Sequence, residues 1–294
     1  YTRVYDRLYA EYTVKDLGEV SLLLGLRIQR NLEAGTMHID QTVYVEDLLE
    51  KFGMTDAATR DTPGDVNVKL SYDMCPTTPE DIEAMKAVPY RELVGGLIYL
   101  LMTRPDIASP VSEVSRYSAN PGPEHWKAAK RILRYLSKTR SLGLTIGRGG
   151  SGDSQLLLSG YADASYADDV DERKSVTGYV FMLGNTPISY KTRRQTSVTH
   201  SSTEAELFAI DEAAREAMYL RSLLDDLGVS QTMSGTLIRE DNQSCIALCK
   251  NPVHHEKTKH VAVRYFYIRG LIDLDMIAVE YCPTNDMVAD IMTK

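Results

Sequence analysis

The sequence is poor in cysteine and in positive charge, and it lacks long apolar runs. Its four cysteines show no spacing typical of a disulfide framework. No apolar run is long enough for the core of a signal peptide or for a membrane span. Lys and Arg number 33 against 41 Asp and Glu, which gives a formal net charge of -8. Bulk charge therefore excludes a general polyanion binder, so any contact with nucleic acid must come from a local basic patch. We expect an intracellular protein in a reducing compartment, with no membrane partner.

The sequence does contain enough apolar material for more than one folded unit. Of its 294 residues, 43% are hydrophobic, and this length and composition favour two or three units with buried cores. The chain begins without an initiator Met and stops at Lys294, in the first turns of a predicted helix, so we expect a fragment of a longer protein. The Gly- and Ser-rich stretch at residues 148–154 predicts a linker and the clearest boundary.

The first part of the chain predicts a β-hairpin followed by a helix. Val20–Gln29 has the pattern of a buried strand, and Thr36–Asp40 completes the hairpin. Gln41–Phe52 carries apolar residues at four-residue steps and is followed by Gly53 as a stop, which predicts a helix. Within it, Tyr44–Asp47 looks like the Tyr-x-Asp-Asp turn of a reverse transcriptase, but that motif needs two adjacent aspartates on a tight hairpin. We therefore interpret this segment as an ordinary part of the helix.

Three helices are predicted between an exposed connection and the linker. Thr59–Pro89 is rich in Asp, Pro and Thr, which is typical of an exposed connection with little core of its own. The helices are predicted at residues 90–102, 105–118 and 123–138.

The third of these helices carries five cations on one face, next to an apolar stripe. They are Lys127, Lys130, Arg131, Arg134 and Lys138. A charge run is usually a solvated helix face, but such a face usually mixes signs and this one does not. Two interpretations stay open: a solvated face, and a surface that contacts nucleic-acid phosphates.

Beyond the linker, the pattern predicts a mixed α/β fold. Strands are predicted at residues 155–164, 175–183, 186–191, 235–240 and 277–282. Helices are predicted at residues 203–227, 242–250 and 261–274, and from residue 286 onward. Three sequential strands that can pair as hairpins, followed by strands that alternate with helices, give a five-stranded mixed sheet with helices packed on it.

Two aspartates stand at the ends of predicted strands. Asp163 ends the first strand after the linker and Asp241 ends the fourth. If these strands lie side by side and parallel, both acids emerge at the same carboxyl edge of the sheet. A magnesium site needs several carboxylate oxygens held at separate points of a rigid frame. The alternative for each residue is an ordinary aspartate that forms a turn after a strand.

The long helix offers two acids to such a site, Glu204 and Glu206. Ser201 and Glu204 fit a capping box, in which Glu204 returns to the backbone N–H of Ser201. Glu206 shares its helix face with Ile210, Ala213, Ala217, Leu220 and Leu224. We therefore expect Glu206 to face the sheet. Asp290, in the last predicted helix, has apolar neighbours, where a carboxylate is costly unless it is paired or binds a metal.

With these motifs in order, residues 155–294 resemble the ribonuclease H domain of copia-type retrotransposon polyproteins. The matching segments are Tyr161–Ser165, Thr177–Val180, Glu206–Ile210, Asp241–Gln243 and Ala289–Lys294. Each motif alone is a weak signal, but their common order over about 140 residues is specific. The resemblance implies a ribonuclease H-like arrangement of the five-stranded mixed sheet.

The residues before the linker resemble the reverse transcriptase of the same polyproteins. The matching segments are Lys15–Gly18 and Leu23–Leu26 for the end of the palm with its primer-grip hairpin, and Tyr90–Gly95 and Thr103–Ile107 for the helical thumb or connection. Residues 1–65 are thereby assigned to a palm remnant and residues 66–147 to the thumb or connection. The palm strands that bear the polymerase aspartates are absent, so we do not expect this fragment to polymerise DNA by itself.

The resemblance implies a metal-dependent endonuclease that hydrolyses the RNA strand of an RNA/DNA hybrid. It implies two Mg²⁺ ions about 4 Å apart, with Mn²⁺ as a substitute, bridged by Asp163 and otherwise held by Glu206, Asp241 and Asp290. The expected partners are the hybrid, template–primer nucleic acid and the rest of the polyprotein, in a cytoplasmic retroelement particle or in the nucleus. Two alternatives stay open: a decayed remnant that only binds nucleic acid, and an integrase-like nuclease, although integrases usually place their Glu last.

One departure from the ribonuclease H pattern concerns histidine. Many ribonucleases H carry a mobile His in the loop before the last helix, whereas residues 282–286 are short and contain none. A basic stretch lies earlier and contains Lys257, Lys259 and His260. We interpret it as a surface patch near the hybrid rather than as a catalytic His site. Cys245 and Cys249 together with nearby histidines could mimic a zinc site, but a helix core face explains them better.

Overall fold

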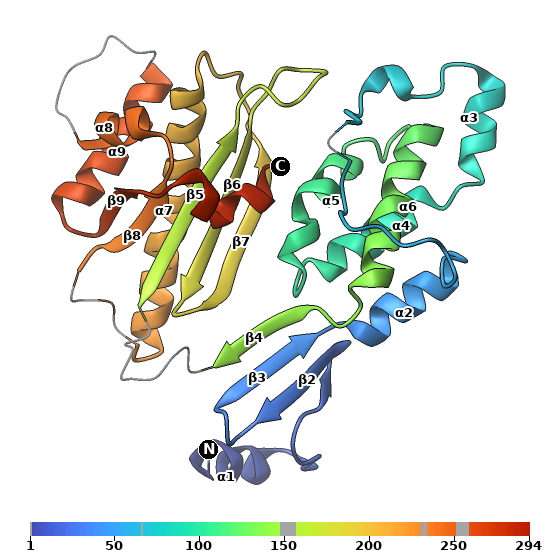
Figure 1. Cartoon of the computed structure of the whole chain (residues 1–294). Helices are drawn as coiled ribbons and strands as arrows, with labels where there is room; N and C mark the ends of the chain where they lie inside the picture. Colours follow the sequence, from blue (N-terminus) through green and yellow to red (C-terminus); the bar gives the residue numbers. More distant parts are fainter. Residues whose placement is uncertain (1, 66, 148–156, 230, 232–233, 251–258) are drawn as a thin grey trace.

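The computed structural model describes residues 2–65, 67–147, 157–229, 231, 234–250 and 259–294. Figure 1 shows three parts: a small sheet near the N-terminus, a helical part, and a larger sheet that lies beside the helical part and is flanked by helices of its own. The linker predicted at residues 148–154 lies outside the described residues. Within the part of the chain that the structure describes, no helix has both the length and the apolar character that a membrane crossing needs.

Helix α1 (Thr2–Glu11) precedes a small antiparallel sheet whose strands follow one another in chain order. They are β1 (Leu22–Leu23), β2 (Leu26–Asn31), β3 (Thr36–Asp40) and β4 (Gly143–Gly147). Strand β4 comes after the whole helical part and pairs with β3, with Thr36 opposite Gly147 and Asp40 opposite Gly143. The sequence pattern did not predict this fourth strand.

The single buried strand expected at Val20–Gln29 is wrong, because the chain reverses within it. Leu24 and Gly25 form the tight turn between β1 and β2, with φ angles of 50° and 74°. This is the left-handed geometry of a two-residue hairpin turn, which glycine adopts readily and leucine only at a cost. The Tyr99 hydroxyl donates a hydrogen bond to the backbone carbonyl of Leu24. Leu24 is 78% exposed, so this apolar run is not a core strand.

The helical part has one shared hydrophobic core. Its elements are α2 (Thr42–Lys51), η1 (Tyr72–Met74), α3 (Pro79–Lys86), α4 (Tyr90–Leu100), η2 (Pro105–Ile107), α5 (Ala108–Ser115) and α6 (Pro123–Lys138), where η denotes a 3₁₀ helix. Leu48 of α2, Leu97 of α4 and Leu133 of α6 belong to the same core, so α2 packs across the predicted boundary at residue 65. Leu70 is buried there too, and α3 was not predicted, so the segment Thr59–Pro89 is more than an exposed connection.

The larger sheet has five strands and confirms the predicted mixed fold. Its strands, in spatial order, are β7 (Thr186–Arg194), β6 (Val176–Leu183), β5 (Leu158–Ser165), β8 (Thr236–Glu240) and β9 (Ile277–Tyr281). Strands β5, β6 and β7 are antiparallel neighbours, whereas β8 runs parallel to both β5 and β9. The helices packed on the sheet are α7 (Ser202–Asp226), α8 (Gln243–Lys250) and α9 (Lys259–Asp273). Cys245 and Cys249 are buried in this core, which confirms the core interpretation of that pair.

The end of the chain packs against the sheet near the helical part. The single helix expected from residue 286 onward is wrong, because two short 3₁₀ helices occur instead, η3 (Thr284–Asp286) and η4 (Val288–Met292). Met287 separates them in an extended conformation, with φ -75° and ψ 95°, and its buried side chain packs beside Ala289. Met292 contacts Val180 of β6 and Ala108 of α5, so η4 lies between the sheet and the helical part (Figure 1).

An acidic loop between β5 and β6 fastens the larger sheet to the helical part. The Asp169 side chain is fully buried, and its carboxylate pairs with Arg116, which follows α5, and with Arg194 of β7. The Asp171 Oδ1 atom accepts a hydrogen bond of 2.8 Å from the backbone N–H of Tyr72. The polar contacts of Asp169 and Asp171 therefore fix the larger sheet against the helical part.

Candidate active site

Two aspartates emerge at the same edge of the larger sheet. Strands β5 and β8 are parallel neighbours in which Tyr161 lies opposite Arg239. Asp163 and Asp241 each stand two residues beyond that pair, so their side chains reach the same level of the carboxyl edge. The placement of these two acids that the strand pattern predicted is confirmed.

The third acid comes from the first turns of α7, whose N-terminus is fixed by a serine cap. The Ser201 hydroxyl accepts a hydrogen bond of 3.1 Å from the backbone N–H of Glu204. The Glu204 carboxylate accepts one of 2.7 Å from the backbone N–H of His200, not from that of Ser201 as the capping box predicted. Because Glu204 is committed to the cap, Glu206 is the acid that faces the sheet, as helical periodicity predicted.

Asp163, Glu206 and Asp241 converge on one point. Each offers one carboxylate oxygen, and these oxygens lie within 4.8 Å of one another. Asp163 is 4% exposed and Glu206 is 6% exposed, whereas Asp241 is half-buried. The Glu206 Oε2 atom is buried and has no hydrogen-bond partner among the described residues. An orphaned acceptor beside two other carboxylates is costly by itself, and it fits a site that takes a divalent cation through oxygen ligands.

The crowding of acids shifts their pKa values upward. Burial raises the pKa of the Asp163 carboxyl, against the opposing effect of a hydrogen bond from Thr293. Burial also raises the pKa of Glu206, and the neighbouring charges of Glu240, Asp163 and Asp241 raise it further. Carboxylates in a desolvated site resist being ionised together, so a bound cation would relieve their mutual repulsion.

Glu240 is a further buried acid at this site that the sequence analysis missed. It is the last residue of β8 and is 0% exposed; its Oε1 atom accepts a hydrogen bond of 3.0 Å from the backbone N–H of Asn242. Its Oε2 atom has no partner within the described part of the chain, and burial raises its pKa well above the ordinary value. The signal was present in the alternation of β8, where Thr236, Ile238 and Glu240 all point inward.

Asp290 lies near these acids but is outside the converging group of described residues. Its Oδ1 atom pairs with Lys294 Nζ at 2.6 Å. After burial, the charge of Asp290 is among the causes that raise the pKa of Asp163, so the two carboxyls are close enough to interact. The partner that the sequence analysis required for Asp290 is therefore Lys294.

The five cations of α6 are only partly unpaired, and whether they contact nucleic-acid phosphates stays a prediction. Three of them form ion pairs with acids, and these pairs are Lys127–Glu124, Arg131–Asp65 and Lys138–Asp61. Asp61 and Asp65 come from the loop that follows α2, so the helical spacing of α6 alone could not reveal them. The Lys130 ammonium lies 5.5 Å from the centre of the Trp126 ring, a cation–π contact.

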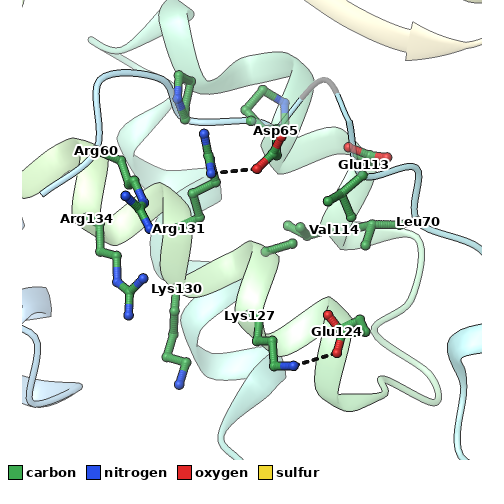
Figure 2. Close-up of a pocket in the computed structure, with 15 residues that line it drawn as sticks. Arg60, Asp65, Leu70, Glu113, Val114, Glu124, Lys127, Lys130, Arg131 and Arg134 are labelled. Carbon is green, nitrogen blue, oxygen red and sulfur yellow. Dashed lines mark hydrogen bonds and ion pairs between the residues drawn. The ribbon is translucent and has the colours of Figure 1, made fainter. Parts of the chain in front are cut away.

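A pocket of about 450 Å³ opens beside this face of α6. Its walls carry the ion pairs Arg131–Asp65 and Lys127–Glu124, drawn as dashed lines in Figure 2. Arg60, Lys130 and Arg134 also line the pocket, and they form no ion pair with a described acid. Among the described residues, these three cations therefore have no carboxylate within ion-pair distance.

The second basic stretch falls largely outside the described residues, so its predicted contact with the hybrid stays a prediction. Lys257 lies outside the described residues. Lys259 and His260 begin α9, but their side chains are outside the described part of the chain. Arg264, further along α9, pairs with Asp211 of α7 at 2.9 Å, which is a structural role.

The strand order and the position of the acids define a class of protein. A mixed sheet ordered β7-β6-β5-β8-β9, with acids on β5, directly after β8 and on the helix that follows β7, is the ribonuclease H-like fold. Among solved structures, LC11-RNase H1 isolated from compost matches 47% of this chain and 92% of its own, with 16% identity and a TM-score of 0.36. The foamy viral protease-reverse transcriptase in complex with dsDNA matches 71% of this chain and 42% of its own, with 17% identity and a TM-score of 0.42.

No family model matches the chain, but curated proteins do. The Pol polyprotein from transposon TNT 1-94 of Nicotiana tabacum is 41% identical over 288 residues, which are 98% of this chain and 21% of that protein. The Pol polyprotein from transposon RE2 of Arabidopsis thaliana is 35% identical over 98% of this chain and 19% of its own length. A Saccharomyces cerevisiae protein assigned to transposon Ty5-1 is 33% identical over 73% of this chain and 68% of its own length. The chain belongs to the copia-type retrotransposon Pol polyproteins, and it spans about a fifth of the first two relatives.

Proposed function

We propose that this chain is a metal-dependent endonuclease that hydrolyses the RNA strand of RNA/DNA hybrids within a Pol polyprotein. The observation that carries the proposal is the convergence of oxygens from Asp163, Glu206 and Asp241 within 4.8 Å, with one buried oxygen of Glu206 left without a described partner. Three neighbouring carboxylates, two of them buried, repel one another, so they favour a bound cation over a purely structural role.

The chemistry of the donors favours Mg²⁺, with Mn²⁺ as a substitute, because all of them are carboxylate oxygens. Asp163, Glu206 and Asp241 would hold the metal, and Asp290 would join them once its ion pair with Lys294 opens. When bound, the metal supplies an activated water and stabilises negative charge on the phosphate and on the leaving oxygen. The Thr284 hydroxyl orients Asp241 by donating a hydrogen bond of 2.8 Å to its Oδ2 atom.

The pocket beside α6 supports a contact with the phosphate backbone of the bound nucleic acid. Arg60, Lys130 and Arg134 are the cations of this pocket that keep their charge unpaired by described acids, so each can replace a counterion of the duplex. The other cations of α6 contribute less, because carboxylates already neutralise them. Selection of the RNA strand would rest on contacts with its 2′-hydroxyl groups.

A cleavage assay on labelled duplexes tests the proposal. The chain is incubated with Mg²⁺ and an RNA/DNA hybrid, and with double-stranded DNA and double-stranded RNA for comparison. We expect the unaltered chain to cut the RNA strand of the hybrid and Asp163→Asn to leave it intact. Asp226→Asn is the matched control, because it changes an exposed Asp at the end of α7 and should cut normally. Cleavage by Asp163→Asn at the unaltered rate would overturn the assignment.

The same assay separates the two alternative functions. Binding of the hybrid without cleavage by the unaltered chain would indicate a decayed remnant that only binds nucleic acid. Cutting of double-stranded DNA in preference to the hybrid would indicate an integrase-like nuclease. The intact convergence of three acids argues against a decayed remnant, because a decayed site has no reason to keep them together. The position of Glu206 in the chain, between Asp163 and Asp241, argues against an integrase-like nuclease.

A further inference from the structure

A threonine near the end of the chain reaches one acid of the site. Thr293 is 2% exposed, and its hydroxyl donates a hydrogen bond to the Oδ2 atom of Asp163. The same hydroxyl lies 3.2 Å from the backbone carbonyl of Asp290. A hydroxyl has one proton to donate, and the Asp163 carboxylate is both the nearer and the charged acceptor. The Thr293 hydroxyl therefore donates its hydrogen bond to Asp163.

The hydrogen bond between Thr293 and Asp163 is supported by a row of residues on three neighbouring strands. Asp163 of β5 lies opposite Gly178 of β6, and Gly178 lies opposite Thr192 of β7. A Cβ atom at Gly178 would lie 2.5 Å from Met292 Cβ and 2.7 Å from Thr293 Cγ2, so glycine leaves the room that the chain end occupies. The Thr192 hydroxyl donates a hydrogen bond of 2.7 Å to the backbone carbonyl of Met292. The row of strand residues thus fixes the backbone that presents the Thr293 hydroxyl.

We propose that Thr293 is a positioning residue that orients Asp163 for metal binding. Its hydroxyl holds one carboxylate oxygen and so fixes the rotation of the carboxylate plane relative to Glu206 and Asp241. Groups that orient a ligand typically contribute about 10- to 100-fold to metal affinity or activity. The inference rests on the proposed function, because it requires that Asp163 binds metal.

Three variants separate the effect of the hydroxyl from the effect of packing. Thr293→Val removes the hydroxyl and keeps the branched shape, whereas Thr293→Ser keeps the hydroxyl and removes the methyl group. Thr186→Val is the matched control, because it removes a buried hydroxyl on β7 that bonds the Thr145 carbonyl at the other end of the sheet from Asp163.

Binding of Mg²⁺ is measured by titration calorimetry on the full chain, and the rate of hybrid cleavage is measured against Mg²⁺ concentration. We expect Thr293→Val to weaken Mg²⁺ binding by about 10- to 100-fold and to regain its kcat at saturating Mg²⁺. Thr293→Ser and Thr186→Val should bind Mg²⁺ as the unaltered chain does. Unchanged affinity in Thr293→Val overturns the inference, and so does an equal loss in Thr293→Ser.

Two controls keep the result decisive. Circular dichroism and thermal unfolding without metal report whether each variant is folded, and Thr293→Ala replaces Thr293→Val if the latter does not fold. Failure of the proposed function has a different signature, since the unaltered chain would then bind Mg²⁺ but leave the hybrid uncut. In that case calorimetry would still compare the Mg²⁺ affinities of the Thr293 variants, so the role of Thr293 in metal binding would be decided independently of cleavage.

Discussion

Arg116, which follows α5, and Asp169, in the loop between β5 and β6, form an ion pair with 3.0 Å between Nη1 and Oδ1. Arg194 of β7 binds the other oxygen, Oδ2, so the fully buried carboxylate is held by one cation from each side of the junction. Burial pushes the pKa of Asp169 upward, but the hydrogen bond from Arg194 and the charge of Arg116 hold it below its ordinary value. The ionised form of Asp169 therefore joins the helical part to the larger sheet.

Loss of Arg116 should destabilise the protein. Arg116→Met leaves Asp169 buried with one of its two cations missing, and we expect the free energy of unfolding to fall by about 1–3 kcal/mol. Denaturation by urea measures this change. Arg215→Met is the matched control, because Arg215 also pairs with a buried Asp but is itself 55% exposed, and it should cost less than about 1 kcal/mol. Equal losses in the two variants would contradict a special role for the junction.

The acid site should make the metal-free protein less stable as pH rises. Burial, followed by neighbouring charge, raises the folded-state pKa of Glu206 and Asp163. A carboxyl whose pKa is raised on folding holds its proton more tightly in the folded state, so stability falls as pH rises above the unfolded value of about 4.3 for Glu. We expect the melting temperature in the presence of a chelator to fall between about pH 5 and pH 8. Glu240→Gln, which removes one charge from the buried group, should flatten this dependence.

Asp169 acts in a different pH range and so does not obscure this effect. Its pKa is lowered on folding, so its contribution is present above the unfolded value of about 3.9 and is lost as pH falls through the folded value. A melting temperature that stays flat from about pH 5 to pH 8 in the unaltered chain would contradict the predicted repulsion among the acids.

Mg²⁺ should stabilise the fold through the converging acids. A ligand that binds only the folded state raises stability in proportion to the logarithm of its concentration above the dissociation constant. We expect the melting temperature to rise with added Mg²⁺ more at pH 8 than at pH 5, because protonated carboxyls bind metal poorly. Asp163→Asn should lose the response, whereas Asp226→Asn should keep it. An equal response in both variants would place the metal elsewhere.

A methyl group at Gly178 should disturb the end of the chain. In Gly178→Ala the new Cβ atom would lie 2.5 Å from Met292 Cβ, and we expect a loss of about 1–3 kcal/mol in the free energy of unfolding. Gly95→Ala is the matched control, because a Cβ atom there meets nothing within 4 Å on an exposed face of α4. That variant should gain about 0.5–1 kcal/mol, because alanine favours the helix. Chemical denaturation measures the free energy of unfolding of both variants. An unchanged value in Gly178→Ala would contradict the close packing of Met292 and Thr293 on Gly178.

Removal of an unpaired cation should weaken binding to nucleic acid and its dependence on salt. Arg134→Ala in an Asp163→Asn background, which prevents cleavage, should reduce the slope of log K against log salt by about 1. Fluorescence anisotropy with a labelled hybrid measures this slope. Lys86→Ala, which removes an exposed cation paired with Glu83 on α3, should leave the slope unchanged. A slope that is the same for both variants would exclude the pocket as a phosphate contact.

Local periodicity is sufficient to predict much of the site. Asp163 and Asp241 follow from strands that end in acids, and the parallel pairing of β5 with β8 then brings them to one edge. The inward position of Glu206 follows from the helical period of α7, and Glu204 is already bound to the backbone in the N-terminal cap. Glu240 could also have been predicted, because it alternates with Thr236 and Ile238 on the buried face of β8.

Contacts between segments far apart in the sequence could not be predicted from local pattern. The pairing of Lys138 with Asp61 depends on how the loop after α2 folds onto α6. Likewise, the apolar run at residues 20–29 has the composition of a core strand, and only the positive φ of Leu24 shows that the chain turns there. Thr293 gave no sequence signal, because its role depends on the space above Gly178.

The pairing of Asp40 with Gly143 places the entry and the exit of the helical part next to each other. Residues 41–142 thus form an insertion between two neighbouring strands of one sheet, β3 and β4. If a short turn replaced this insertion, β3 and β4 would form an ordinary antiparallel hairpin. The helical part is therefore one continuous segment that the strand order of the small sheet does not require. One hydrogen-bonded ladder therefore ties together the two covalent connections of the helical part to the small sheet.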